Sequence, residues 1–429
     1  MIDAFRDAFR LPDLKRRILF VIGALFIFRL GAHIPTPGIN VEALRSSNAA
    51  GQGILGFLDM LTGGALSNFG IFSLGVGPYI NSSIVMQLLV VIFPSLEKMQ
   101  KEGEEGRKKI TQYTRMGTIF FAVVQAIGLT AWLRNIQVFQ GGAFEISVAV
   151  IAITTGAVVV MWLGEVMSDH GVGNGTSMII YAGIVSRFPA TISNTITSII
   201  GGTANILVVT VALVVIIAVV AGCVCLQEGQ RRLPVQYAKR MVGNKVYGGQ
   251  STFIPLRVNT AGVIPIIFAS SVLLFPGMIA GLFEGSTADA IRSMFSRTSA
   301  IYTILDIALI IFFSYFYTAV VFNPGELSNN MKKYGGFILG IRPGKPTTEY
   351  IERVMSRITL GGAVALAVIT LIPNFISMVM KVQTLAFGGT AVIIVVGVAL
   401  DTIHQVEGQM LMRHYDGILK RRGKSGGLL

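Results

Sequence analysis

Charged residues are scarce in this chain. Only 13% of its 429 residues are Asp, Glu, Lys or Arg, whereas an average soluble protein carries about 25%. The mean hydropathy is +0.68, and long apolar runs separate the charged segments. These features exclude an ordinary soluble domain, and we predict an integral membrane protein. Continuous apolar blocks favour an all-α protein over a β-barrel, whose strands alternate over short segments.

Ten apolar runs approach the roughly 20 residues that a helix needs to cross the hydrocarbon core. We therefore predict ten transmembrane helices. The fifth run is short and could continue through Pro189. The runs cover 18–34, 70–94, 116–133, 146–167, 176–188, 204–226, 261–283, 301–322, 358–379 and 384–403.

Catalytic and metal-binding patterns are also missing. The two cysteines, Cys223 and Cys225, lie inside the sixth span, where we interpret them as packing residues rather than a disulfide or a metal pair. The sequence has no zinc-ligand spacing, no phosphate-binding P-loop and no nucleophile turn. We expect no enzyme activity, no metal and no cofactor, so energy from a nucleotide would have to come from a partner.

Ionisable residues are almost absent from the middle of the spans. Arg29, Asp306 and Asp401 lie near span ends, where we interpret them as boundary residues, and Arg29 can snorkel to the surface. A secondary transporter, which can also have two five-span halves and broken helices, would need a coupling charge at mid-membrane. An intramembrane enzyme would need a nucleophile or a metal cluster. Solute uptake in liposomes would identify a transporter.

Positive charge is concentrated in alternate loops. Of the 35 Lys and Arg residues, 28 lie in residues 1–17, 98–115, 231–257, 332–357 and 413–424. The positive-inside rule places these segments, and both termini, in the cytoplasm. An even number of spans agrees with that orientation.

Two long cytoplasmic loops, 227–260 and 323–357, combine positive charge with Tyr, Gly and Pro turn signals. We interpret them as ordered, protruding cationic loops. Such loops suit a polyanionic partner such as RNA phosphate, or an acidic protein surface. The alternative is that the charge serves topology and anionic lipid alone.

Glycines interrupt the chain around residues 55–68. This stretch would be roughly 21 Å long as a helix, too short for a core of about 30 Å. We predict that it re-enters the membrane from the external side. A short helix between glycines could be a movable stopper, and a helix on the external surface is the alternative.

Motifs along nearly the whole chain carry a family resemblance. They are TGGALS (62–67), GPYI (77–80), QKEGEEGRKKITQYTR (100–115), MWLGE (161–165), GVGNGTS (171–177), QRRLPVQYAKR (230–240), GVIPIIFASS (262–271), YFYTAVVFNP (315–324) and GIRPGKPT (340–347). Together they resemble the SecY family, the channel subunits of the bacterial protein-translocation machinery.

The resemblance implies a clamshell of two pseudo-symmetric five-helix halves, 1–200 and 201–429, around an hourglass pore. It implies a plug helix at 55–68 that includes Leu55, Phe57, Leu58, Met60, Leu61, Gly63, Gly64 and Leu66. It also implies a pore ring of Ile80, Ile84, Ile180, Ile267 and Ile394. Thr176 stands where the family usually has a bulky aliphatic residue, so we leave it out of the ring.

The resemblance further implies a lateral gate between the second and seventh spans, with Gln87 and Asn259 as polar contacts that help to close it. Ordinary interhelical packing is the alternative for these two residues. Expected partners are the small subunits SecE and SecG, the motor ATPase SecA, the ribosome, signal sequences, nascent polypeptides and lipid. Expected docking residues are Arg231, Arg232, Lys239, Arg240, Arg342 and Lys345.

The implied activity is the movement of unfolded secretory polypeptides across the bacterial plasma membrane and the lateral release of transmembrane segments into it. A girdle of branched aliphatic side chains suits that activity, because it gates by dewetting and still deforms around many sequences.

Overall fold

A computed structural model describes residues 11–37, 56, 59–135, 139, 142–202, 205–237, 240–242, 245–247, 251–280, 290–291, 293–295, 299–380 and 389–425. Leu55, Phe57, Leu58 and Lys239 lie outside this part of the chain, as does the side chain of Arg240. The chain divides into two compact units. One falls within 1–201, 271–299 and 398–429, and the other within 202–270 and 300–397. The predicted division near residue 200 stays a prediction.

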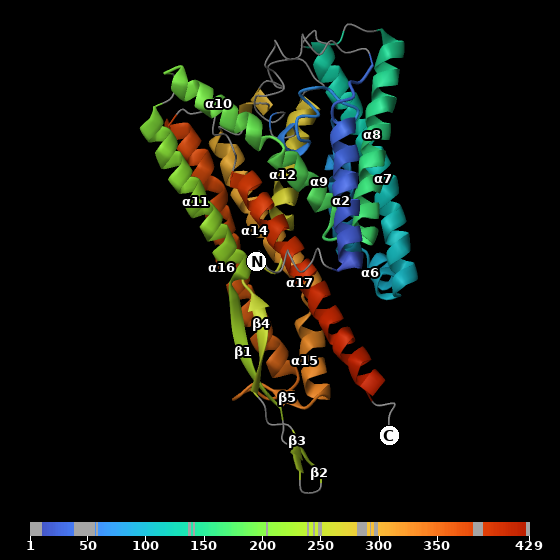
Figure 1. The fold of residues 1–429 in the computed structure, drawn as a ribbon, viewed down its shortest axis with the longest axis vertical. Helices are drawn as coiled ribbons and strands as arrows, with labels where there is room; N and C mark the ends of the chain where they lie inside the picture. The colour runs from blue at the N-terminus through green and yellow to red at the C-terminus, as the bar shows by residue number, and fades with distance from the viewer. Residues whose placement is uncertain are drawn as a thin grey trace. The chain divides into compact units, whose positions relative to one another are not determined.

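The first unit is helical. It contains α2 (Pro12–Gly31), α5 (Gly77–Ile92), α6 (Pro94–Lys101), α7 (Glu104–Asn135), α8 (Ala143–His170), α9 (Gly175–Val185) and α10 (Phe188–Ile200). Helices α2, α7 and α8 run side by side (Figure 1). The chain segment around Leu66, Phe69 and Leu74 packs into a core with apolar residues of α7 and α8.

Proline sets the break between α5 and α6. Phe93 precedes Pro94 and has φ −102° and ψ 110°, as expected because a proline disfavours the helical conformation of the residue before it. The chain bends by 102° at this point. The predicted span over 70–94 is wrong at its start, since residues 71–76 form turns and the helix begins at Gly77.

The second unit contains α11 (Ile206–Glu228), α14 (Ala300–Val321), α15 (Pro324–Lys333) and α16 (Lys345–Met380). Helices α12 (Ile264–Ala280) and α17 (Gly389–Ser425) contribute residues to both units. Asn205 and Asn323 cap the N-termini of α11 and α15 with their side chains, which satisfies backbone N–H groups that have no partner within the helix.

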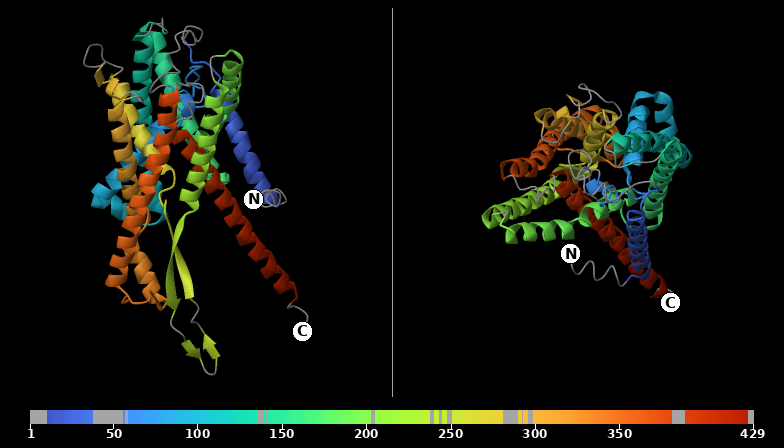
Figure 2. Two further views of the ribbon diagram at one scale, coloured as in Figure 1. Left: turned by 90° about the vertical axis from the view of Figure 1, so that its left-hand side faces the viewer. Right: turned by 90° about the horizontal axis from the view of Figure 1, so that it is seen from above.

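A small sheet replaces part of the predicted cationic loops. Strands β1 (Gln230–Tyr237) and β4 (Ser251–Arg257) form an antiparallel ribbon that extends beyond α11, with β2 (Arg240–Val242) and β3 (Lys245–Tyr247) at its tip (Figures 1 and 2). The two-residue strand β5 (Gly336–Phe337) pairs with β1. The all-α expectation does not include this sheet, since it rests on the Tyr, Gly and Pro turn signals of the loop. The signal for a strand is the alternation around Leu233 and Val235, which are both buried.

Six described helices are long and apolar enough to cross a membrane, and the bent pair α5 and α6 brings the number to seven. The helical membrane class is therefore confirmed. Ten spans stay a prediction.

Candidate functional site

Two consecutive helix-ending turns build a distinctive segment between α2 and α5. The first follows a helical turn at 59–61. Gly64 N–H donates to the carbonyl of Asp59 at 2.8 Å, and Gly63 N–H donates to that of Met60 at 3.3 Å. This is the Schellman arrangement, which needs a left-handed residue after the helix. Gly63 supplies it with φ +67°.

The second turn repeats the pattern with a phenylalanine in the left-handed position. Gly70 N–H donates to Ala65 O at 2.7 Å, and Phe69 N–H donates to Leu66 O at 3.0 Å. Phe69 has φ +44°, a conformation that is costly for a non-glycine residue. Its ring is fully buried in the core of the first unit, and this burial offsets the cost. We call residues 59–70 the double-turn segment.

The expected helix over 55–68 is therefore wrong from residue 62 onward. The sequence interpretation treated the glycines as flexible joints at the ends of a helix. In the structure Gly63 and Gly64 have φ +67° and +88°, values that a right-handed helix cannot contain.

A break between α9 and α10 faces the double-turn segment. Pro189 has no N–H to donate to Val185 and cannot continue α9, so the chain makes a tight turn at Ser186 and Arg187. Arg187 N–H donates to Ile184 O at 3.2 Å, and Thr191 N–H donates to Arg187 O at 3.0 Å. The turn thus holds Arg187 between two hydrogen-bonded helix ends.

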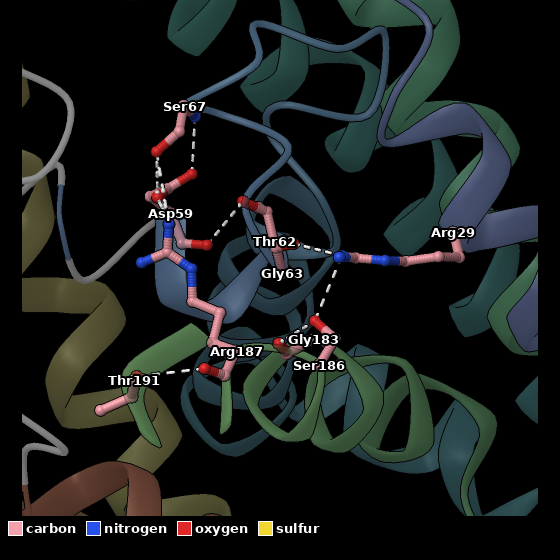
Figure 3. A network of polar contacts seen from close by, with 9 residues as sticks. All are labelled: Arg29, Asp59, Thr62, Gly63, Ser67, Gly183, Ser186, Arg187 and Thr191. Atoms are coloured by element: carbon pink, nitrogen blue, oxygen red, sulfur yellow. Dashed lines mark hydrogen bonds and ion pairs between the residues drawn. The ribbon is translucent and has the colours of Figure 1, made fainter. Parts of the chain in front are cut away.

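Asp59 and Arg187 form an ion pair at this contact (Figure 3). The Asp59 side chain has no solvent exposure, and that of Arg187 is 32% exposed. Asp59 Oδ1 accepts from Ser67 N–H at 2.6 Å. Its Oδ2 accepts from the Ser67 hydroxyl and from Arg187 Nη2. Arg187 Nη2 also donates to Ser67 Oγ at 3.3 Å.

Arg29 reaches the same segment from α2 (Figure 3). Its Nη1 donates to the Gly63 carbonyl and, at 3.2 Å, to Ser186 Oγ. Ser186 Oγ donates in turn to Gly183 O at 2.8 Å. The guanidinium of Arg29 therefore binds protein groups, and its interpretation as a boundary residue that snorkels stays a prediction.

A small cavity lies behind the segment. Its volume is about 20 Å³, enough for one water molecule. Leu61 and Thr62 line it together with Ile80 of α5, and the polar side chains of Asn81 and Gln125 reach it as well. The double-turn segment therefore adjoins the first of the predicted pore-ring residues.

The predicted ring residues are buried in both units. Ile80, Ile84 and Ile180 belong to the first unit, with 6%, 4% and 1% of their surface exposed. Ile267 and Ile394 belong to the second unit and are also buried. Ile80 and Ile84 lie one turn apart on α5 and share a face. A ring of all five stays a prediction.

The predicted gate residues make local hydrogen bonds. Gln87 Nε2 donates to Ser83 Oγ at 3.3 Å on the same helix. Gln87 Oε1 is buried and has no hydrogen-bond partner among the described residues. Asn259 is buried, and its Nδ2 donates to Gly262 O at 2.9 Å. Each residue therefore makes a hydrogen bond within its own unit, and their mutual contact stays a prediction.

The predicted docking residues lie in the second unit. Arg231 and Arg232 are exposed on β1. Arg342 lies before α16, and its carbonyl accepts from Thr347 Oγ1 at 2.8 Å. Lys345 is the first residue of α16. Leu233 of β1, Met331 of α15 and Ile351 of α16 pack together in one buried apolar cluster. This cluster joins the three elements near the charged residues.

Sequence interpretation missed the contact of Asp59 with Arg187. The available signal was the presence of charged residues in otherwise apolar stretches, since a charge buried without a partner is costly. Spacing could not pair them, because 128 positions separate the two residues.

The fold and site define a helical membrane protein of several spans, in which a charged network holds the double-turn segment against the helices. A sequence model of the family described as SecY matches residues 70–403. The protein translocase subunit SecY of Escherichia coli is 46% identical over 426 residues, which is 97% of this chain and 96% of that protein. That of Thermus thermophilus is 41% identical over 430 residues, 98% of each chain.

Solved structures share the fold. One described as a protein-conducting channel aligns with a TM-score of 0.66 at 17% identity, over 92% of each chain. Sec61 in the canine ribosome-channel complex from the endoplasmic reticulum aligns with a TM-score of 0.63 at 17% identity, also over 92% of each chain. The chain belongs to the SecY family.

Proposed function

We propose that this chain is the channel subunit of a bacterial protein translocase. It moves unfolded secretory polypeptides across the plasma membrane and releases transmembrane segments sideways into the lipid. The observation that carries the proposal is the 46% identity to a translocase subunit over 97% of the chain. The scarcity of charge in the spans supports a passive conduit rather than an ion-coupled pump.

In this proposal ten spans cross the membrane, with both termini in the cytoplasm. The described helices provide six or seven of these spans. Further candidates are α2, whose first residues are polar, and α12, which contains Pro276. The concentration of Lys and Arg in alternate loops supports this orientation.

The channel is closed by two elements in series. One is the aliphatic ring of Ile80, Ile84, Ile180, Ile267 and Ile394, which excludes water because it offers no hydrogen bonds. The other is the double-turn segment, which acts as the plug. The cavity that Leu61 and Thr62 share with Ile80 supports their action at one place.

A lateral gate between α5 and α12 releases apolar segments. Gln87 on α5 and Asn259 just before α12 close it by polar contact. The buried Oε1 of Gln87, which lacks a hydrogen-bond partner among the described residues, supports a role in such a contact, since an unsatisfied buried acceptor is costly. A signal sequence opens the gate by offering its own apolar surface.

The cytoplasmic ends of the second unit are the docking surface for the ribosome and the SecA motor, and SecE and SecG are the small membrane partners. The guanidinium groups of Arg231, Arg232 and Arg342 suit RNA phosphate or an acidic protein surface. The buried cluster beneath them keeps the surface ordered.

Reconstitution tests the proposal. The chain is placed in liposomes with its small subunits, the motor ATPase and a secretory precursor. ATP-dependent protection of the precursor from external protease is the expected result. Protection that does not depend on the chain, or ATP-independent uptake of a small solute in place of protection, would contradict it.

A further inference from the structure

We propose that Asp59 and Arg187 form an electrostatic latch that holds the double-turn segment in its closed position. The inference rests on the proposed role of that segment as the plug. Arg187 is a positioning residue in this scheme, because it acts by fixing Asp59 rather than by touching the polypeptide that crosses.

The contacts of Asp59 divide into two kinds. The hydrogen bonds from Ser67 N–H, at 2.6 Å, and from the Ser67 hydroxyl lie within the segment. They tie its first turn to its second, so they move with the segment. The ion pair to Arg187 joins the segment to the α9–α10 turn. Release of the segment therefore breaks the ion pair and leaves the Ser67 contacts intact.

Burial makes the pair sensitive to charge. The Asp59 side chain has no solvent exposure. In the closed state its carboxylate therefore depends on Arg187 for a positive counter-charge. A buried ion that loses its partner is strongly disfavoured. The closed state should therefore lose stability when Arg187 is neutralised, whereas an open segment gives Asp59 access to water.

Arg29 provides a contrasting contact. It donates to the backbone carbonyl of Gly63. This contact, unlike the ion pair, does not depend on any side chain of the double-turn segment. Arg29 and Arg187 also repel each other. The negative charge of Asp59 offsets this repulsion, because it pairs with Arg187. When Asp59 is neutral, the repulsion between the two arginines is no longer offset. Loss of charge at Asp59 should therefore favour opening even though Asn can still accept from Ser67.

The test measures the resting ion conductance of the complete channel complex in planar bilayers. We expect Asp59→Asn and Arg187→Gln each to raise it by about tenfold to hundredfold, the effect of losing a hydrogen bond to a charged group. The double variant should conduct no more than the single ones, and Arg187→Lys should stay near the parent. Lys101→Gln, which removes the same charge from an exposed pair with Glu97, is the control.

A second measurement separates opening from misfolding. Ala65 is fully buried in the closed segment, and Ile153 is fully buried in α8, so each is replaced with Cys in turn. In a chain with Cys223 and Cys225 replaced by Ala, we expect Asp59→Asn to expose position 65 to an external, membrane-impermeant thiol reagent. Position 153 should remain unreactive. Equal reactivity at both positions would indicate general unfolding and would overturn the latch.

Deletion of residues 59–68 separates the latch from the plug. If the deletion raises the conductance while Asp59→Asn and Arg187→Gln do not, the latch is overturned and the plug stands. If the deletion also leaves the conductance unchanged, the segment is not a plug and both ideas fail. The latch would also be overturned if the double variant raised the conductance by the product of the increases in Asp59→Asn and Arg187→Gln, because residues whose effects are independent do not form a pair.

Discussion

The carbonyl oxygen of Leu61 faces Gly183 so closely that a Cβ on this glycine would lie 2.4 Å from it. Such an approach is far inside normal van der Waals contact. The same Cβ would meet the backbone nitrogen of Gly63 at 3.1 Å. Helix α9 therefore supports the double-turn segment by direct backbone contact, beside the ion pair at Arg187.

Gly183→Ala should displace the segment from its closed position. Because the obstacle is backbone, the strain can be relieved only by a shift of the segment or of α9. Overpacking of this kind costs about 1–3 kcal/mol, which corresponds to a roughly fivefold to hundredfold rise in the resting open fraction. Single-channel conductance of the reconstituted complex measures it.

Gly23→Ala is the matched control, because Gly23 lies in α2 and a Cβ added there would meet no atom within 4 Å beyond the neighbouring residues and backbone of its own helix. Its conductance should equal that of the parent. If Gly183→Ala has the resting conductance of the parent, the close contact between Gly183 and the Leu61 carbonyl does not help to keep the channel closed.

Polar substitution of the ring should let water and ions through. Replacing Ile80 and Ile84 with Asn adds two amides on one face of α5. Each amide that gains water at the constriction recovers about 1–3 kcal/mol, so ion leak should rise by about tenfold per residue. Proton or potassium efflux from proteoliposomes measures the leak. Ile→Val at both positions keeps the face apolar and should leave the ion leak at the parent level. If the Asn variants also leak no more than the parent, the constriction lies elsewhere.

The sequence predicts the class of fold better than it predicts the site. Apolar runs and charge scarcity indicate helices because helix length and membrane thickness are fixed quantities. The glycines at 63 and 64 indicated a break, yet its form depended on left-handed backbone angles and on a core that holds Phe69. The partners of Arg29 could not be predicted, since they lie 34 and 157 positions away.

The ribbon of β1 and β4 should depend on its buried face. Leu233 is 2% exposed and packs in a cluster with Ile351 and Met331. Leu233→Ala should cost about 2–5 kcal/mol of local stability, and limited proteolysis within 230–257 should become faster. Gln230→Ala, at the first position of the same strand, should leave the rate unchanged. Equal rates in both variants would mean that the cluster does not order the ribbon.

Asn259→Leu tests the proposed gate. An interhelical hydrogen bond in a membrane is worth about 0.6–2 kcal/mol, so its loss should raise transport of a precursor with a defective signal sequence by roughly threefold to thirtyfold. Thr260→Val, which removes a hydroxyl that donates to Arg257 O at 3.1 Å in the same turn, should not. If Asn259→Leu leaves the dependence on the signal sequence unchanged, the gate role of Asn259 fails.

Arg342→Glu separates docking from loop structure. The loop is held by groups other than the Arg342 guanidinium, including Thr347 Oγ1 on the Arg342 carbonyl at 2.8 Å and Ser328 Oγ on Gly344 O at 3.0 Å. Charge reversal should therefore keep the loop and repel an acidic or phosphate-bearing partner, which costs several kcal/mol.

We expect motor-driven precursor transport by Arg342→Glu to fall by at least about tenfold, with normal insertion of the protein itself into the membrane. Arg353→Glu makes the same charge change at a position farther along α16 and should transport normally. Normal transport by Arg342→Glu would remove Arg342 from the docking surface. Equal losses in both variants would mean that the partner responds to the overall charge of this face rather than to the loop.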